Sequence, residues 1–222
     1  ASLVLNALRA QHKHKITFIW SGQHYSDNLK DIFFRELGVA APDLELGVSG
    51  DSDAAIAGAM IQKLSPVLQD LKPDAVMFLG DTNTIVGCIA ACQLNIPIVH
   101  FEGCWHSYDW RMPEDKYRRI IDQVSDVIYT YFPEHKLQGM VGGLNQKSIV
   151  VTYGNPIVEI LQTYYYDRKA QFDAMSTSEF FSSRGIAKGQ YYLMTCHRRE
   201  NVHIRSSFEA ILKLIEQARY PI

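Results

Sequence analysis

Short apolar runs alternate along this chain with stretches of helical periodicity. Strands are predicted at residues 15–20, 44–48, 74–80, 96–102, 127–132 and 148–153. Helices are predicted between them, at residues 25–37, from a cap at Ser49 or Asp51 to residue 71, at 82–94 and 113–123, and from Pro133 onward. Almost wholly apolar strands that alternate with helices are typical of a parallel sheet covered on both faces. The chain is therefore predicted to have an α/β fold in which helices flank a parallel sheet.

The pattern changes after Pro156, which predicts three segments. Residues 1–156 form the sheet domain, residues 157–184 form a helical linker, and residues 185–222 begin a second domain with a strand at 190–196 and a helix at 203–219. One strand and one helix cannot bury both faces of the strand, so the second domain is expected to be truncated. The first domain is also expected to lack its first strand, because it opens on a helix.

Composition narrows the functional classes. The formal net charge of -2 gives no electrostatic reason to expect nucleic acid or an anionic membrane as a partner. No apolar run approaches the roughly 20 residues that a membrane span needs, and no leader is recognised, so a cytoplasmic location is expected. Spacings of Cys88, Cys92, Cys104 and Cys196 fit neither a CxxC pair nor a zinc site. These cysteines are predicted to be reduced structural thiols, and no metal is expected.

Charged residues gather where the two central strands end. Asp81 follows the strand at 74–80, and Glu102 ends the strand at 96–102. Carboxyl ends of parallel strands meet at one edge of a sheet, so both groups are expected to face one crevice. Asp81 taken alone is better explained as a helix cap than as a functional residue. Glu102 is harder to dismiss, because a charge at the end of an apolar strand needs a partner or a solvated cleft.

The helix that starts at Pro113 adds Glu114 and, one turn later, Arg118. The two residues read either as a surface i,i+4 pair or as a cleft carboxylate with an arginine that grips a phosphate. His100 is better explained as a core histidine than as a catalyst. Residues 197–201 resemble a phosphate-facing loop, although a solvated turn would look similar.

Gly154-Asn155-Pro156 reads either as a helix start or as a backbone ligand site, with the helix start favoured. Taken together, the carboxylates, histidine and arginines favour a nucleotide-linked substrate and proton-transfer chemistry.

Six motifs together resemble the non-hydrolysing UDP-N-acetylglucosamine 2-epimerases. They are GQHY (22–25), GDTNT (80–84), HFEG (100–103), MPEDKYRR (112–119), GNP (154–156) and HRREN (197–201). The resemblance implies two Rossmann-like domains of the GT-B type, of which the second is only begun here. It also implies inversion at C2 of UDP-GlcNAc by elimination of UDP to 2-acetamidoglucal and re-addition, with no redox cofactor, in a homodimer.

The resemblance also assigns roles by motif position. It implies four catalytic residues: Asp81, Glu102, Glu114 and His197. It implies five substrate-binding residues, of which Gln23 and Arg198 match positions that touch a second, activating UDP-GlcNAc in some members: Gln23, His24, Arg118, Asn155 and Arg198.

One motif departs from the family pattern. Where the family usually reads EAGLRS, residues 102–107 read EGCWHS, so Trp105 and His106 replace a leucine and an arginine. The departure leaves other UDP-amino sugars open, such as a UDP-diacetamido-glucuronic acid. A hydrolysing epimerase, a GT-B glycosyltransferase and a non-catalytic nucleotide-sugar-binding fragment are the further alternatives. The 222-residue chain by itself is expected to be inactive or nearly so, because most of the second domain is absent from it.

Overall fold

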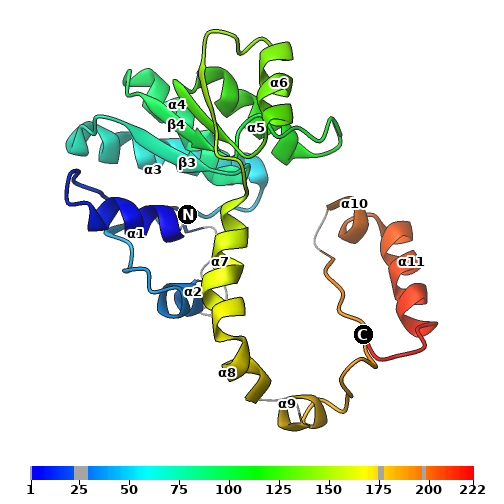
Figure 1. Ribbon diagram of the computed structural model, residues 1–222. Helices are drawn as coiled ribbons and strands as arrows, with labels where there is room; N and C mark the ends of the chain where they lie inside the picture. Colours follow the sequence, from blue (N-terminus) through cyan, green and yellow to red (C-terminus); the bar gives the residue numbers. More distant parts are fainter. Residues whose placement is uncertain (1, 23–29, 175–177, 197–198) are drawn as a thin grey trace. The chain divides into compact units, whose positions relative to one another are not determined.

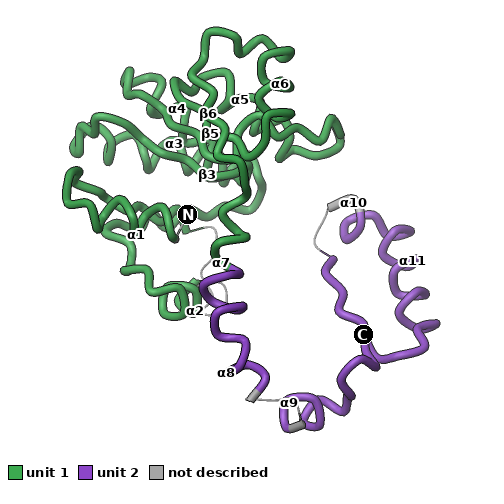
Figure 2. Tube along the Cα trace, in the orientation of Figure 1, with its two compact units in different colours: residues 1–160 green, residues 161–222 purple. Residues whose placement is uncertain are grey.

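The computed structural model describes residues 2–22, 30–174, 178–196 and 199–222. The chain divides into two compact units, residues 1–160 and residues 161–222 (Figure 2). Within the described residues, no helix is both long and apolar enough to cross a membrane.

The first unit alternates strands and helices (Figure 1). Its strands are β1 (Ile19–Trp20), β2 (Leu44–Glu45), β3 (Val76–Leu79), β4 (Ile98–Phe101), β5 (Val127–Thr130) and β6 (Ser148–Val151). Its helices are α1 (Ser2–Ala10), α2 (Asp31–Glu36), α3 (Asp53–Leu71), the 3-10 helix η2 (Asn83–Gly87), α4 (Cys88–Gln93), α5 (Pro113–Val124), α6 (Pro133–Val141) and α7 (Pro156–Tyr164), the last of which runs into the second unit. The predicted strand and helix positions are confirmed for most of this unit.

Four strands form one parallel sheet in the order β3-β4-β5-β6, and β1 pairs with β2 in a separate parallel pair. Leu79 lies opposite Phe101, and Phe101 lies opposite Tyr129, so three strands end almost level with one another. Strands that are neighbours in this sheet also follow one another in the chain. Because right-handed crossovers join them, the connecting helices lie on one face of the sheet. The predicted parallel sheet flanked by helices is confirmed.

The two faces of this sheet differ. Phe78, Ile98 and Ile128 point into the core beneath the helices and are buried. Met77 and Leu79 alternate with Phe78 and are 45% and 44% exposed. The prediction that both faces are covered is therefore wrong for the described residues, because all the crossovers between β3 and β6 fall on the same side.

Two helix starts differ from their predictions. Helix α3 is capped by Ser52, whose Oγ accepts a hydrogen bond from Ala55 N at 3.2 Å, and not by Ser49 or Asp51. The single helix predicted at residues 82–94 is a 3-10 turn followed by α4, and Thr82 occupies its N-cap position. Asp81 therefore does not cap this helix, and its carboxylate is left for another partner.

The second unit holds the 3-10 helix η3 (Tyr166–Arg168), α8 (Lys169–Ala174), α9 (Ser178–Ser182), α10 (Arg199–Val202) and α11 (Arg205–Glu216). The helix predicted at residues 203–219 is confirmed by α11. The strand predicted at residues 190–196 is not formed, and Leu193 is almost fully exposed. A strand needs a neighbour to satisfy its backbone, and the described part of this unit offers no sheet.

Candidate active site

Three neighbouring strands deliver polar side chains to one edge of the sheet. Asp81 lies two residues beyond β3, Glu102 follows β4 directly, and Tyr131 follows β5 directly. The segments that carry them stay in register, because Gly80 N donates to Phe101 O at 3.0 Å. This is the edge where parallel sheets collect their ligands.

Arg118, from α5, holds two of these carboxylates. Its Nη2 donates to Asp81 Oδ2 at 2.7 Å and to Glu102 Oε1 at 3.2 Å. The arginine side chain is 8% exposed, whereas those of Asp81 and Glu102 are 26% and 24% exposed. Arg118 Nη1 also donates to the backbone oxygen of Trp105. One buried cation therefore brings together two carboxylates that remain open to a ligand.

Glu102 receives a second donor on its other oxygen. Tyr131 Oη donates to Glu102 Oε2 at 2.7 Å. Burial raises the pKa of Tyr131, and the neighbouring Glu102 raises it further, so the phenol keeps its proton. Glu102 itself has a positive φ of 71°, a conformation that costs a non-glycine residue on the order of 1–3 kcal/mol. These contacts fix the side chain of a strained residue.

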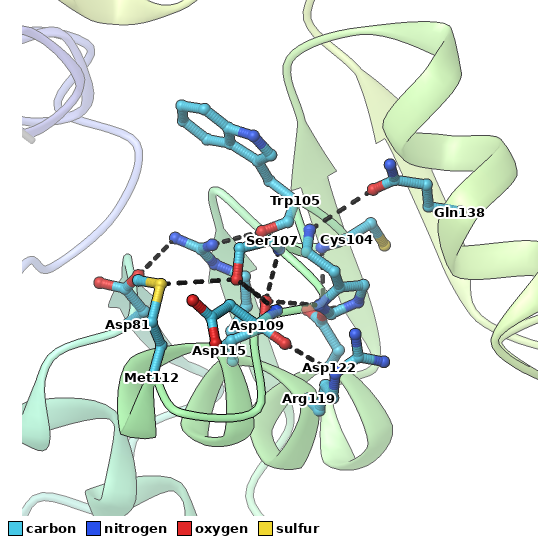
Figure 3. A network of polar contacts seen from close by, with 12 residues as sticks. Asp81, Cys104, Trp105, Ser107, Asp109, Met112, Asp115, Arg119, Asp122 and Gln138 are labelled. Atoms are coloured by element: carbon cyan, nitrogen blue, oxygen red, sulfur yellow. Dashed lines mark hydrogen bonds and ion pairs between the residues drawn. The ribbon is translucent and has the colours of Figure 1, made fainter.

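A second polar network anchors the loop after Glu102 to α5 (Figure 3). Asp115 accepts hydrogen bonds from Ser107 N at 2.6 Å, Ser107 Oγ at 3.1 Å and Arg119 Nε at 2.9 Å. Burial by itself would raise the pKa of Asp115, but the bonds from Ser107 and Arg119 outweigh it and lower this pKa. Asp115 is therefore an ionised anchor for the loop.

Asp122 is the other anchor and lies about two helical turns after Asp115 in α5. It accepts from Cys104 N at 2.9 Å and pairs with His100 Nδ1 at 2.7 Å. His100 Nε2 must carry a hydrogen, because its partner at 2.8 Å is the carbonyl oxygen of Gly80. Since His100 is fully buried and bonded at both nitrogens, its interpretation as a core histidine is confirmed.

His106 lies against this second network. Its Nε2 is 3.4 Å from Asp122 Oδ2, and its Nδ1 is 3.9 Å from Asp115 Oδ1. Burial lowers the pKa of His106, although the negative charge of Asp122 opposes that effect. The imidazole is therefore held largely neutral and packs as part of the loop anchor.

Trp105 places an aromatic ring beside the carboxylates. Its ring lies edge-on to Tyr131 at 5.9 Å and is stacked on His135 at 5.4 Å between centroids. The Arg118 guanidinium lies 5.7 Å from the same ring. Trp105 is also partly exposed, so it forms a wall of the candidate site.

The structure brings together only some of the residues predicted from the sequence. Asp81, Glu102 and Arg118 form one cluster. Glu114 lies one turn before Arg118 and makes no hydrogen bond or ion pair with any described residue, so the i,i+4 pair is not formed. Asn155 Oδ1 accepts from Ile157 N at 3.0 Å, as the helix-start interpretation expects. Four further predicted residues lie outside the described residues: Gln23, His24, His197 and Arg198. The catalytic and substrate-binding roles of all nine stay predictions.

Sequence reasoning missed Tyr131, Asp115 and Asp122. The strand-end rule that selected Asp81 and Glu102 would also have selected Tyr131, which follows the next strand of the sheet. No local signal distinguishes Asp115 from its neighbour Glu114, because only the packing of α5 decides which one is buried. Within the described ranges, no group of three or more His, Cys, Asp and Glu side chains could hold a metal ion.

Comparison with known proteins adds a family match. A family model described as UDP-N-acetylglucosamine 2-epimerase matches residues 6–221. A UDP-2,3-diacetamido-2,3-dideoxy-D-glucuronate 2-epimerase of Pseudomonas aeruginosa is 37% identical over 130 residues, 58% of this chain and 37% of that protein. A UDP-N-acetylglucosamine 2-epimerase of Methanococcus maripaludis is 33% identical over 204 residues, 90% of this chain and 53% of that protein.

Comparison with solved structures adds a match in fold. The fold is similar to that of Methanocaldococcus jannaschii UDP-GlcNAc 2-epimerase in complex with UDP-GlcNAc and UDP, with a TM-score of 0.83 and 30% identity. That match covers 97% of this chain and 59% of the other. The chain thus spans about half the length of most relatives that it matches.

Proposed function

The chain belongs to the UDP-N-acetylglucosamine 2-epimerase family, and we propose that it carries one wall of the active site of an epimerase that inverts C2 of a UDP-amino sugar. The observation that supports this proposal most directly is the pairing of Asp81 and Glu102 through Arg118 at the carboxyl edge of the sheet. Two accessible carboxylates on one buried cation supply proton-transfer groups beside a positive charge.

The chemistry that we propose has two stages. In the first, a carboxylate removes the C2 proton, the C1–C2 double bond forms, and the bond from C1 to the UDP oxygen breaks, which releases UDP and 2-acetamidoglucal. In the second, UDP adds back to C1 and a proton is delivered to the opposite face of C2. Glu114 and, outside the described residues, His197 are the further acid–base candidates. Arg118 offsets the charge of the carboxylates so that both remain in place during proton transfer.

UDP-GlcNAc is the substrate that we propose, with UDP-ManNAc as product. A UDP-diacetamido-glucuronic acid is the second candidate, because the relative that acts on such a sugar is 37% identical over the 130 matched residues. Trp105 and His106 stand where the sequence departs from the usual family motif, so they are the residues to examine for this choice.

Nuclear magnetic resonance in D2O tests the proposal. The full product of the gene that encodes this chain is incubated with UDP-GlcNAc, and the C2 proton and anomeric signals of the sugar are followed. We expect loss of the C2 proton signal together with the appearance of UDP-ManNAc. Free ManNAc would instead indicate a hydrolysing enzyme, and binding without any exchange would indicate a nucleotide-sugar-binding protein.

The same experiment with a UDP-diacetamido-glucuronic acid decides between the two substrates. A Glu102→Gln variant serves as the control, because it keeps the shape of the side chain but cannot accept the proton. We further propose that the full gene product is a homodimer and acts in the cytoplasm, without nucleic acid or membrane partners. The four free cysteines of this chain fit a reducing compartment.

A further inference from the structure

Tyr131 is the one described side chain besides Arg118 that binds the Glu102 carboxylate. Its hydroxyl lies 2.7 Å from Glu102 Oε2, while Arg118 Nη2 lies 3.2 Å from Glu102 Oε1. Each carboxylate oxygen therefore has its own donor, and the two donors come from different elements. Such a pair of contacts restricts both the position and the rotation of the carboxylate.

Packing around Tyr131 leaves its hydroxyl little freedom. The residue is 5% exposed, and its ring is held edge-on by Trp105. Its backbone oxygen accepts from Gly154 N at 3.1 Å, which ties the position to the end of β6. The hydroxyl is thus carried to Glu102 by a rigid strand end and not by a flexible loop.

Both contacts are donated to Glu102. A guanidinium can only donate, and the Tyr131 hydroxyl keeps its proton because burial and Glu102 raise the pKa of the phenol. Each donor bonds a different oxygen of the Glu102 carboxylate. Among the residues that the structure describes, only Arg118 donates to the Asp81 carboxylate, on Oδ2. The two carboxylates of the site are therefore held unequally.

We propose that Tyr131 is a positioning residue that fixes the Glu102 carboxylate in the orientation in which it takes part in proton transfer at C2 of the bound UDP-amino sugar. This inference rests on the function proposed above. Tyr131 lies in none of the sequence motifs.

The other charged groups around Glu102 stay the same when only the Tyr131 hydroxyl is removed. Arg118 reaches Glu102 from α5, and Asp81 shares that guanidinium from the end of β3. Neither of these groups is altered by removal of one phenol oxygen. A change caused by that removal therefore reports on Tyr131 itself.

The experiment compares Tyr131→Phe with Tyr129→Phe in the full gene product. Tyr129 lies two residues earlier, within β5, where its ring stacks on Phe101 at 4.6 Å between centroids. Both variants lose one phenol oxygen from neighbouring positions of the same segment, and only Tyr131→Phe removes a hydrogen bond to Glu102. Circular dichroism and denaturant unfolding establish that both variants are folded.

Rates of C2 proton exchange and of epimerisation are then measured at neutral pH. For Tyr131→Phe we expect kcat to fall about tenfold and KM to stay within about twofold. Tyr129→Phe should match the wild type. An unchanged kcat in Tyr131→Phe would overturn the proposal.

A second measurement does not depend on turnover. The carboxyl carbon of Glu102 is followed by NMR in the labelled 222-residue chain, with Glu102→Gln to assign the signal. Tyr131→Phe should move this signal at neutral pH, and Tyr129→Phe should leave it in place. If the signal moves but the wild-type gene product exchanges no C2 proton, the contact stands and the proposed function fails. If neither variant moves it, the positioning role is wrong whatever the enzyme does.

Discussion

Arg118 and Arg119 are neighbours on α5 and serve two carboxylate networks of very different character. Arg118 joins Asp81 and Glu102, and each of these two side chains is about a quarter exposed. Arg119 binds Asp115, which is 2% exposed and whose two carboxylate oxygens accept hydrogen bonds from Ser107 and Arg119. The residue types are the same, yet one network has room for a ligand and the other has none.

This difference teaches that burial and occupied hydrogen-bond positions, and not the presence of carboxylates, separate a reactive site from a structural anchor. Asp115 and Asp122 tie the loop of residues 103–112 to α5, and that loop begins at Glu102. The anchor network thereby holds the reactive network in place. Changes to the reactive network should act on activity, and changes to the anchor network should act on stability.

The largest effect is expected from Arg118→Met in the full gene product. Loss of the buried cation leaves Asp81 and Glu102 facing each other without an opposite charge, so kcat/KM should fall by about 10²–10³-fold. Arg119→Met is the matched control on the next residue, with a change in kcat/KM of less than about threefold. Steady-state kinetics on both variants measures this, and equal losses would end the distinction between the two networks.

Asp122→Asn should have the next largest effect, on stability. Removal of a buried charge that pairs with His100 lowers the free energy of unfolding by about 3 kcal/mol. Asp81→Asn, at the more exposed site, should cost less than about 1 kcal/mol. Urea unfolding followed by tryptophan fluorescence reports on the first unit, because Trp20, Trp105 and Trp110 all lie in it. A larger loss for Asp81→Asn would contradict the assignment.

Gly103→Ala tests how tightly the anchor network is packed. A Cβ at this position would lie 2.3 Å from Ile128 Cγ2 and 2.5 Å from Asp122 Oδ1, so unfolding should become easier by about 2 kcal/mol. Gly58→Ala in α3 is the control, since a Cβ there meets nothing within 4 Å. That variant should be stabilised by about 0.5–1 kcal/mol, because alanine favours a helix. The same urea experiment decides both.

Stability should also depend on pH through His106. Burial lowers the pKa of this imidazole below its ordinary value of 6.5, so the unfolded chain binds a proton more readily than the folded chain. Stability is then complete above pH 6.5 and falls as the pH drops below it, by at most about 1.4 kcal/mol per pH unit for this group. His106→Asn should make the slope between pH 6.5 and pH 5 shallower; an unchanged slope would contradict this.

Asp115 acts in a different window, since its pKa is lowered and its contribution is lost only below the ordinary value of 3.8. The two pH ranges can therefore be separated in one series of unfolding curves.

The smallest expected effect concerns the reactivity of the cysteine thiols. Burial raises the pKa of Cys88 and of Cys104 to about 12, so almost no thiolate is present at pH 8. Cys196 is only partly buried and should react with iodoacetamide first. Mass spectrometry before and after addition of urea measures the order, and rapid native labelling of Cys104 would mean that the anchor network is open.

Much of this architecture could be predicted from the sequence. Apolar runs between helical segments predicted the parallel sheet, and the strand-end rule placed Asp81 and Glu102 at one edge. The same reasoning failed at residues 190–196, because an apolar run forms a strand only where another strand can pair with it. It also failed for the second face of the sheet, since coverage depends on the direction of the crossovers.

What the sequence determined by itself is the family, the order of the elements and the edge at which the charged residues gather. Only the tertiary structure decided which side chains pair with one another. Arg118 binds Asp81 and Glu102, 37 and 16 positions away, and does not bind Glu114, which lies one turn away. Tyr131 reaches Glu102 across 29 positions. Such partners are set by strand register and helix packing, because a hydrogen bond depends on distance in space and not on separation along the chain.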